Sequence, residues 1–187
     1  ARLRPYHTLY DPMCGSGTIL IEGAMMVHNI APGVNRYFSA ERWDVIDEKV
    51  WTDERNRARD LVNYDTDFIA YGSDIDEEAL EIAKINAKRA GVERKIKFEK
   101  ADIRNFEPKS EKGTVICNPP YGERLLDIEK AQKLYKIMGE KFIKKHGWSY
   151  YVISPSEEFE KEFGRKADKR RKLYNGMIKC QLFMYFK

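Results

Sequence analysis

The segment Asn118-Pro119-Pro120-Tyr121 carries the most specific chemistry in the chain. Its polar atoms suit one task, which is to present an exocyclic amine to an electrophilic methyl group. The Asn118 side-chain oxygen and the Pro119 carbonyl can accept the two N–H hydrogens of the amine, which favours the pyramidal nitrogen that develops in the transition state. Tyr121 offers a face on which an extruded base can stack. The segment predicts a methyl-acceptor site, with an ordinary proline turn as the alternative.

A second candidate site combines a glycine-rich turn with two carboxylates. The turn Asp11-Pro12-Met13-Cys14-Gly15-Ser16-Gly17 joins a predicted strand to a predicted helix, where a ligand could approach the backbone closely. Position 20 is not glycine and no Gly-Lys-Ser/Thr sequence follows, so the dinucleotide and P-loop fingerprints are excluded. Asp74 and Asp102 end the next two predicted strands. Asp74 could hold ribose hydroxyls and Asp102 an adenine amine, with Ile75 covering one face of the ring.

The cysteines and histidines suggest less chemistry. Cys117 could be a nucleophile for methylation at a pyrimidine carbon, but it stands in an apolar run without an adjacent base, which favours a buried strand residue. Cys14 could pack internally or line the ligand-facing side of the glycine-rich turn. The three cysteines and three histidines show no metal-ligand spacing, so we expect no metal.

These residues require a scaffold in which strands and helices alternate. We expect strands at 7–10, 68–73, 96–99, 115–117 and 148–153, and helices at 18–28, 77–90, 127–145 and after 154–156. Asp76 is expected to cap the second of these helices. Asn175-Gly176 predicts a hairpin turn between strands at 172–174 and 177–186. The pattern indicates one α/β domain with a mostly parallel sheet, helices on both faces, and a partly helical insertion at about 29–67.

Composition and charge restrict the class of protein. The chain has 187 residues, of which 42% are hydrophobic, and no apolar run is long enough to span a membrane. We therefore expect a soluble cytoplasmic protein. The formal net charge of +4 is too small to indicate a nucleic-acid partner. The basic stretch at 165–172, together with Arg36 and Arg42, could contact phosphates, and a solvated turn is the alternative for that stretch.

Taken together, the motifs resemble class I methyltransferases that act on exocyclic amines. A narrower similarity is to the bacterial large-subunit ribosomal RNA guanine-N2 methyltransferases that carry a THUMP domain. The segments that carry this similarity are Ile21-Glu22-Gly23-Ala24, Asn29-Ile30-Ala31-Pro32-Gly33, Trp43, Gly72-Ser73-Asp74-Ile75-Asp76, Asn118-Pro119-Pro120-Tyr121-Gly122-Glu123-Arg124 and Lys172-Leu173-Tyr174-Asn175-Gly176.

The resemblance implies a Rossmann-like fold with seven strands, the last of them antiparallel. It also implies the cofactor S-adenosylmethionine, with S-adenosylhomocysteine as product, and structured RNA, 23S rRNA in particular, as partner. The implied cofactor residues are Asp11, Cys14, Gly15, Ser16, Gly17, Asp74, Ile75, Asp102 and Asn118. Asn118, Pro119 and Tyr121 would receive the guanine N2.

The similarity covers essentially the whole chain, from 1 to 187, as a single catalytic domain. Relatives carry an N-terminal THUMP region and a helix before the first strand, so we expect this chain to be a fragment without them. The alternative functions are methylation of adenine N6, methylation of a protein glutamine, or an RNA-binding module that has lost catalysis.

Overall fold

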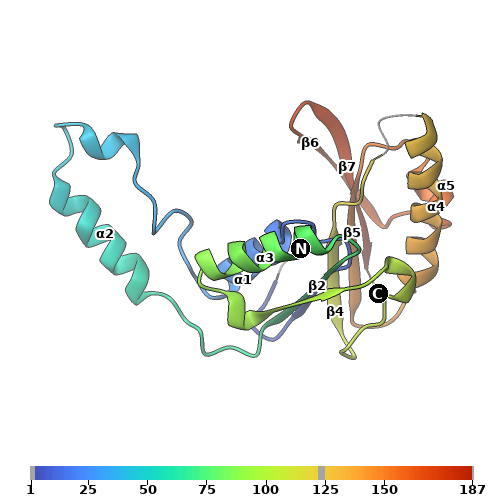
Figure 1. Cartoon of the computed structure of the whole chain (residues 1–187), viewed down its shortest axis with the longest axis horizontal. Coiled ribbons are helices and arrows are strands. Elements are labelled where there is room, and N and C mark those ends of the chain that lie inside the picture. The colour runs from blue at the N-terminus through green and yellow to red at the C-terminus, as the bar shows by residue number, and fades with distance from the viewer. Residues whose placement is uncertain (1–2, 122–124, 187) are drawn as a thin grey trace.

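A seven-stranded sheet forms the centre of the protein (Figure 1). The computed structural model describes residues 3–121 and 125–186, so Gly122, Glu123 and Arg124 of the similarity motif lie outside the described residues. The strands are β1 (Thr8–Asp11), β2 (Ile69–Asp74), β3 (Ile96–Lys100), β4 (Gly113–Cys117), β5 (Trp148–Ser154), β6 (Lys169–Asn175) and β7 (Ile178–Phe186).

The order of the strands across the sheet is β3-β2-β1-β4-β5-β7-β6. The first five strands are parallel, and β7 runs antiparallel to both β5 and β6. The predicted fold class is thereby confirmed. The chain order reverses between β1 and β4, and the carboxyl ends of parallel strands flank a crevice at such a point.

Helices cover both faces of the sheet, α1 and α3 on one face and α4 and α5 on the other (Figure 1). Adjacent residues of β1 point to opposite faces, so Leu9 belongs to the core beneath α1 and α3, whereas Tyr10 belongs to the core beneath α4 and α5. The helices are α1 (Thr18–Val27), α2 (Glu48–Asp60), α3 (Glu77–Arg89), α4 (Leu125–Lys141) and α5 (Phe159–Phe163), with short 3-10 turns η1 (Ser39–Arg42), η2 (Glu93–Lys95) and η3 (Ile103–Asn105).

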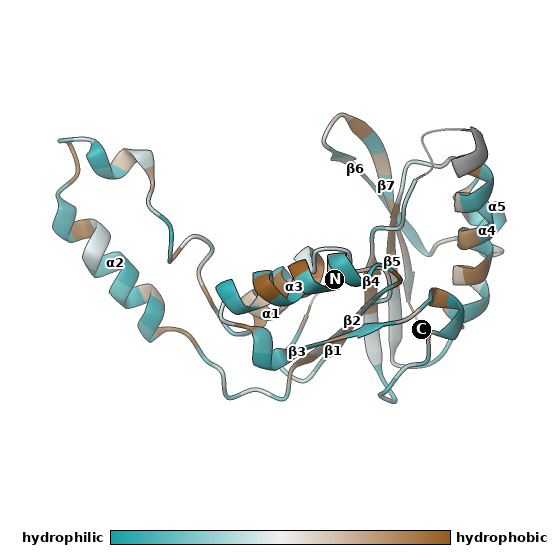
Figure 2. Ribbon diagram, viewed as in Figure 1, coloured by the Kyte–Doolittle hydropathy of each residue, from teal (hydrophilic) through white to brown (hydrophobic). Residues whose placement is uncertain are grey.

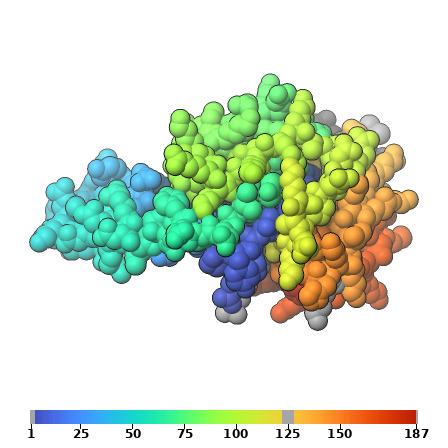
Figure 3. All heavy atoms as spheres, turned by 90° about the horizontal axis from the view of Figure 1, so that it is seen from below, coloured from blue at the N-terminus to red at the C-terminus, as the bar shows by residue number. Residues whose placement is uncertain are grey.

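The insertion forms an arm that projects from the sheet (Figures 1 and 3). No residue of α2 is buried, and the helix is largely hydrophilic (Figure 2). An ion pair between Arg55 and Glu41 ties α2 to η1. At the base of the arm, the backbone N–H of Asn63 donates to the His28 carbonyl over 2.9 Å, and His28 Nδ1 lies 2.9 Å from the Asn63 carbonyl oxygen. These contacts join the two ends of the insertion.

The structure corrects three predicted boundaries. The helix expected to reach residue 145 ends at Lys141, and the segment that follows turns at Gly147, whose φ is 82°, before β5 begins. The helix after Pro155 begins only at Phe159, because the Ser154 hydroxyl accepts the Ser156 N–H and starts a turn.

The third correction concerns the last hairpin. Asn175 is the final residue of β6 and pairs with Ile178, so the turn consists of Gly176 and Met177. Gly176 has a φ of 60°, and a glycine in the first of two turn positions is typical of a type II′ hairpin. The backbone of the turn therefore makes no special demand on Asn175, whose side chain is free for another role.

Candidate functional site

A large cavity opens at the carboxyl edge of the parallel strands. Its volume is about 1060 Å³, which is large enough for a nucleoside cofactor together with a base. The residues that line it are Pro12, Met13, Asp74, Ile75, Asp102, Ile103, Arg104, Asn118, Pro120, Tyr121, Lys130, Ala131, Lys133, Leu134 and Ile137. They come from the ends of β1, β2, β3 and β4 and from one face of α4. The topology thus brings the two predicted sites into one cavity.

The glycine-rich turn is fastened to the end of β2. The Asp74 carboxylate accepts the Gly15 N–H over 2.9 Å, and the Cys14 N–H donates to the Ser73 carbonyl over 3.0 Å. Gly15 and Gly17 have φ values of 50° and 82°, which favour glycine. Gly17 stands at the N-cap of α1 and has no side chain to cap it. The turn is therefore held by Asp74, and the start of α1 faces the same edge of the sheet.

Asp11 lies behind this turn rather than in the lining of the cavity. Its side chain is only 2% exposed, and its carboxylate accepts the Met13 N–H over 3.2 Å. Burial is the main cause that raises the pKa of Asp11 to about 7, opposed by the Met13 hydrogen bond and aided by the nearby Asp74 carboxylate. Asp11 can therefore change its charge near neutral pH. A cationic ligand group close to it would favour the ionised carboxylate.

Asp102 is paired with Arg104, a residue that the motifs did not indicate. The guanidinium donates to both carboxylate oxygens, over 2.9 and 2.6 Å, and the Arg104 backbone N–H adds a bond of 2.8 Å. These bonds lower the pKa of Asp102 to about 2. Asp102 is therefore ionised at neutral pH, and the remaining lone pair on its Oδ2 is available to one further donor.

The Asn118 side chain is linked to the last hairpin through Tyr121. The Tyr121 hydroxyl donates to Asn118 Oδ1, and Asn175 Nδ2 donates to the Tyr121 hydroxyl over 3.1 Å. Burial raises the pKa of Tyr121 to about 12, a rise that the Asn175 amide opposes and the Cys180 thiol reinforces. Tyr121 therefore keeps its proton at neutral pH and remains a donor to Asn118.

Only some of the predicted site residues line the cavity. Asp74, Ile75, Asp102, Asn118 and Tyr121 line the cavity. Pro119 is buried and is not among the lining residues. Pro12 and Met13 of the glycine-rich turn line the cavity as well, whereas Asp11, Cys14, Gly15, Ser16 and Gly17 are not among its lining residues.

Both cysteines considered for chemistry are buried. Cys117 is fully buried in β4, as predicted, and burial raises the pKa of its thiol well above the usual value. Burial also raises the pKa of Cys14 to about 12. Neither thiol is a thiolate at neutral pH, which leaves no support for a cysteine nucleophile.

Sequence reasoning missed Arg104, Asn175 and the α4 residues Leu134 and Ile137. The sequence predicted a helix at 127–145, but nothing in it distinguished the residues that face the cavity from those that face the core.

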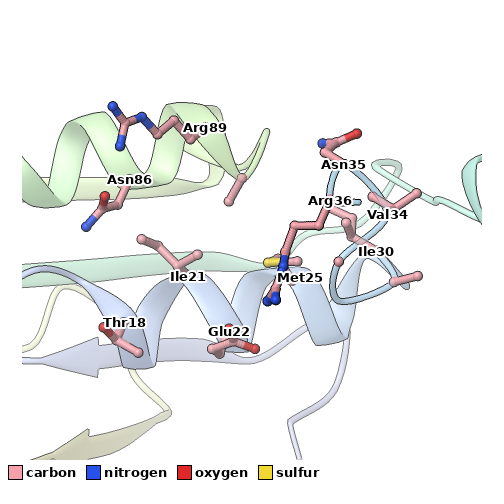
Figure 4. A pocket seen from close by; sticks show the side chains of 13 residues that line it. Thr18, Ile21, Glu22, Met25, Ile30, Val34, Asn35, Arg36, Asn86 and Arg89 are labelled. Carbon is pink, nitrogen blue, oxygen red and sulfur yellow. The ribbon is translucent and has the colours of Figure 1, made fainter. Parts of the chain in front are cut away.

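A second cavity, of about 330 Å³, lies between α1, α3 and the segment 30–36 (Figure 4). Arg36 and Arg89 line it, and both side chains are largely exposed. None of the predicted cofactor or methyl-acceptor residues lines this cavity. Within residues 3–121 and 125–186, no group of three acidic, histidine or cysteine side chains could hold a metal ion, and no helix is long and apolar enough to cross a membrane.

Known proteins are similar to this chain over nearly its whole length. "Putative RNA methyltransferase YpsC" of Bacillus subtilis (strain 168) is 42% identical over 182 residues, which are 97% of this chain and 47% of that protein. "Ribosomal RNA large subunit methyltransferase K/L" of Shewanella sp. (strain W3-18-1) is 41% identical over 183 residues, which are 95% of this chain and 26% of that protein. The chain thus spans about half of the first relative and about a quarter of the second.

A solved structure that is similar to this chain contains S-adenosylhomocysteine. SMU.472, a putative methyltransferase complexed with S-adenosylhomocysteine, superposes with a TM-score of 0.92 and 42% identity, over 100% of this chain and 49% of that one. This confirms the expected cofactor at the level of the relatives, while the guanine-N2 acceptor and the THUMP region stay predictions. The family described as "RMKL-like, methyltransferase domain" matches residues 1–183. The chain therefore belongs to this family of methyltransferase domains.

Proposed function

We propose that this domain transfers a methyl group from S-adenosylmethionine to the exocyclic N2 of a guanine in large-subunit rRNA. One observation carries the proposal: Asn118 and Tyr121 line the same cavity as Asp74 and Asp102. An amine acceptor and a nucleoside cofactor would therefore meet within one cavity. The similarity to a large-subunit rRNA methyltransferase of Shewanella supports RNA as the acceptor.

The residues around the cavity fit the parts of the cofactor. Asp74 would accept the ribose hydroxyls, and Asp102 would accept the adenine amine with its remaining lone pair. Ile75 lies at the cavity as an apolar neighbour for one face of the ring. Asp11, Cys14, Gly15, Ser16 and Gly17 would surround the methionine end, where an ionised Asp11 would oppose the ammonium group. The bound cofactor supplies the electrophilic methyl group.

Binding of the guanine amine requires two hydrogen-bond acceptors and no strong base. Asn118 Oδ1 and the Pro119 carbonyl would each accept one N–H of the guanine amine, which directs the nitrogen lone pair toward the methyl group. Methyl transfer would form the N–C bond as the S–CH3 bond breaks, with S-adenosylhomocysteine as the leaving group, and the amine nitrogen would lose one proton to water. Tyr121 would stack on the base. Excluding bulk water from the cavity would strengthen these hydrogen bonds.

Methyl transfer by the complete natural protein tests the proposal. The acceptors are unmodified 23S rRNA transcribed in vitro, duplex DNA and a glutamine-containing peptide, each incubated with methyl-labelled S-adenosylmethionine. We expect label in the rRNA alone, recovered after digestion as N2-methylguanosine. Label confined to the peptide, or recovered as N6-methyladenine, would contradict the proposal that guanine N2 is the methyl acceptor. RNA binding without any binding of S-adenosylhomocysteine would instead identify an idle RNA-binding module.

A further inference from the structure

We propose that Asn175 is a positioning residue for methyl transfer, acting through Tyr121 to fix the orientation of the Asn118 amide. The inference rests on the proposed function of the Asn-Pro-Pro-Tyr loop. It concerns a residue in the last hairpin, 54 positions from Tyr121 in the sequence. The three side chains form a chain of hydrogen bonds that begins at the sheet edge and ends in the cavity.

The direction of this chain follows from what each atom can do. The Asn175 Nδ2 group only donates, so the Tyr121 oxygen must accept from it. The single hydroxyl proton of Tyr121 then points to Asn118, which must present its oxygen. An amide oxygen has two lone pairs, so Asn118 Oδ1 can accept from Tyr121 and from a substrate amine at once.

The opposite orientation of Asn118 would disable the site. A flipped amide would place its NH2 group where the acceptor is needed, and two N–H groups would then oppose each other. An isolated amide distinguishes its two orientations only through its hydrogen-bond partners. Tyr121 alone could also accept a hydrogen bond from such a flipped amide, because a phenol both donates and accepts. The bond from Asn175 occupies one lone pair of the phenol oxygen and thereby disfavours a second bond from a flipped Asn118 amide.

The position of Asn175 supports a role beyond the turn. It pairs with Ile178 as the last residue of β6, and Gly176 supplies the positive φ that the turn requires. Asn175 is exposed, and its side-chain amide donates to Tyr121. Neither the backbone of the turn nor the core requires an amide side chain here.

The test compares Asn175→Asp and Asn175→Ala in the complete protein, using whichever of rRNA, DNA or peptide the wild type methylates. An ionised aspartate only accepts, so it would take the Tyr121 proton away from Asn118. We expect the single-turnover rate with both substrates saturating to fall at least about tenfold in Asn175→Asp, and by less in Asn175→Ala. Affinity for S-adenosylhomocysteine should not change in either variant, which also verifies that both are folded.

The pH profile separates positioning from a structural effect. A protonated aspartate can donate to Tyr121, so the rate of Asn175→Asp relative to Asn175→Ala should recover as the pH falls from 8 toward 5. In the Tyr121→Phe background both Asn175 variants should lose nothing further. Asn56→Asp on α2 is the control for an added charge away from the site.

Two results would overturn the inference. One is wild-type activity in Asn175→Asp. The other is an activity loss that is independent of pH and equally large in the Tyr121→Phe background. A wild type that methylates DNA or peptide instead of rRNA overturns only the proposed acceptor, because the same variants then test Asn175 on that substrate. A wild type that methylates none of the three overturns both proposals.

Discussion

The Asp74 carboxylate accepts the backbone N–H of Gly15 over 2.9 Å and so joins the end of β2 to the glycine-rich turn 59 residues earlier. Its second oxygen accepts the Asp76 N–H over 3.1 Å. Asp74 therefore has a structural role in addition to the ribose-binding role that we propose. The two roles predict losses in both stability and affinity when the carboxylate is removed.

Asp74→Ala should lower the free energy of unfolding by about 1–3 kcal/mol, because it leaves the Gly15 and Asp76 N–H groups without this acceptor. Affinity for S-adenosylhomocysteine should fall at least about tenfold, measured by calorimetry. Asp76→Ala is the matched control. The Asp76 side chain caps α3 by accepting from Glu78 and Ala79, so its removal should cost about 1 kcal/mol and leave the affinity near that of the wild type. Equal affinity losses in the two variants would contradict the assignment of Asp74.

The buried Asp11 predicts a pH-dependent stability. Its carboxyl has a pKa of about 7 in the folded protein against an ordinary value of 3.8, so the folded state holds the proton more tightly between these values. The free energy of unfolding contributed by Asp11 is thus fully present below pH 3.8, falls as the pH rises toward 7, and is constant above.

Asp11→Asn removes this titration. From pH 5 to pH 8 its free energy of unfolding should rise relative to the wild type by about 2–3 kcal/mol, since each pKa unit is worth about 1.4 kcal/mol. Urea unfolding at the two pH values measures the difference. The wild type should also bind S-adenosylhomocysteine more tightly above pH 7, where Asp11 is ionised, and Asp11→Asn should not. A pH-independent difference in stability would refute the role of burial.

Alanine substitutions at Gly17 and Gly176 distinguish the cost of crowding from the cost of backbone strain. A Cβ on Gly17 would lie 3.1 Å from Ala83 Cβ and 3.2 Å from Phe98 Cζ, whereas a Cβ on Gly176 would meet no atom within 4 Å. Both have positive φ, so each substitution to alanine should cost about 1 kcal/mol in strain. Gly17→Ala should cost about 1–3 kcal/mol more and weaken cofactor binding, because the turn must shift. Equal losses in thermal unfolding would show that the turn has room to adjust.

The basic stretch at 165–172 divides into two groups. Arg165 donates to the Phe142 carbonyl and lies over the Tyr185 ring, and Arg170 pairs with Glu160, so both serve the fold. Residues 169–172 belong to the edge strand β6 rather than to the predicted turn.

Reversing the charges of Lys169, Arg171 and Lys172 should therefore weaken RNA binding. It should reduce the salt slope of log affinity by about 0.7–0.9 for each phosphate contact that is lost. Arg170→Ala, the control, should lower stability and leave the slope unchanged. An unchanged slope in the triple variant would assign these residues to the solvated surface alone.

The features that could be predicted are those that depend on local sequence patterns. Alternation of apolar segments located the strands, and the Asp76 cap was confirmed because it depends on residues two and three positions away. The strand ends placed Asp74 and Asp102 at one edge, which follows from a parallel sheet. What could not be predicted depends on distant contacts or on geometry. Asn175 reaches Tyr121 only because β6 lies at the end of the finished sheet, and the burial of Asp11 depends on residues far along the chain.

The most direct test is nucleoside analysis of 23S rRNA after incubation with S-adenosylmethionine and either the complete wild-type protein or its Asn118→Ala variant. Removing one preorganised hydrogen-bonding group at a reacting centre commonly costs about a hundredfold or more in rate. We expect N2-methylguanosine from the wild type and, over the same time, almost none from the variant. Equal amounts of N2-methylguanosine from both proteins, or a different methylated nucleoside from the wild type, would contradict the account.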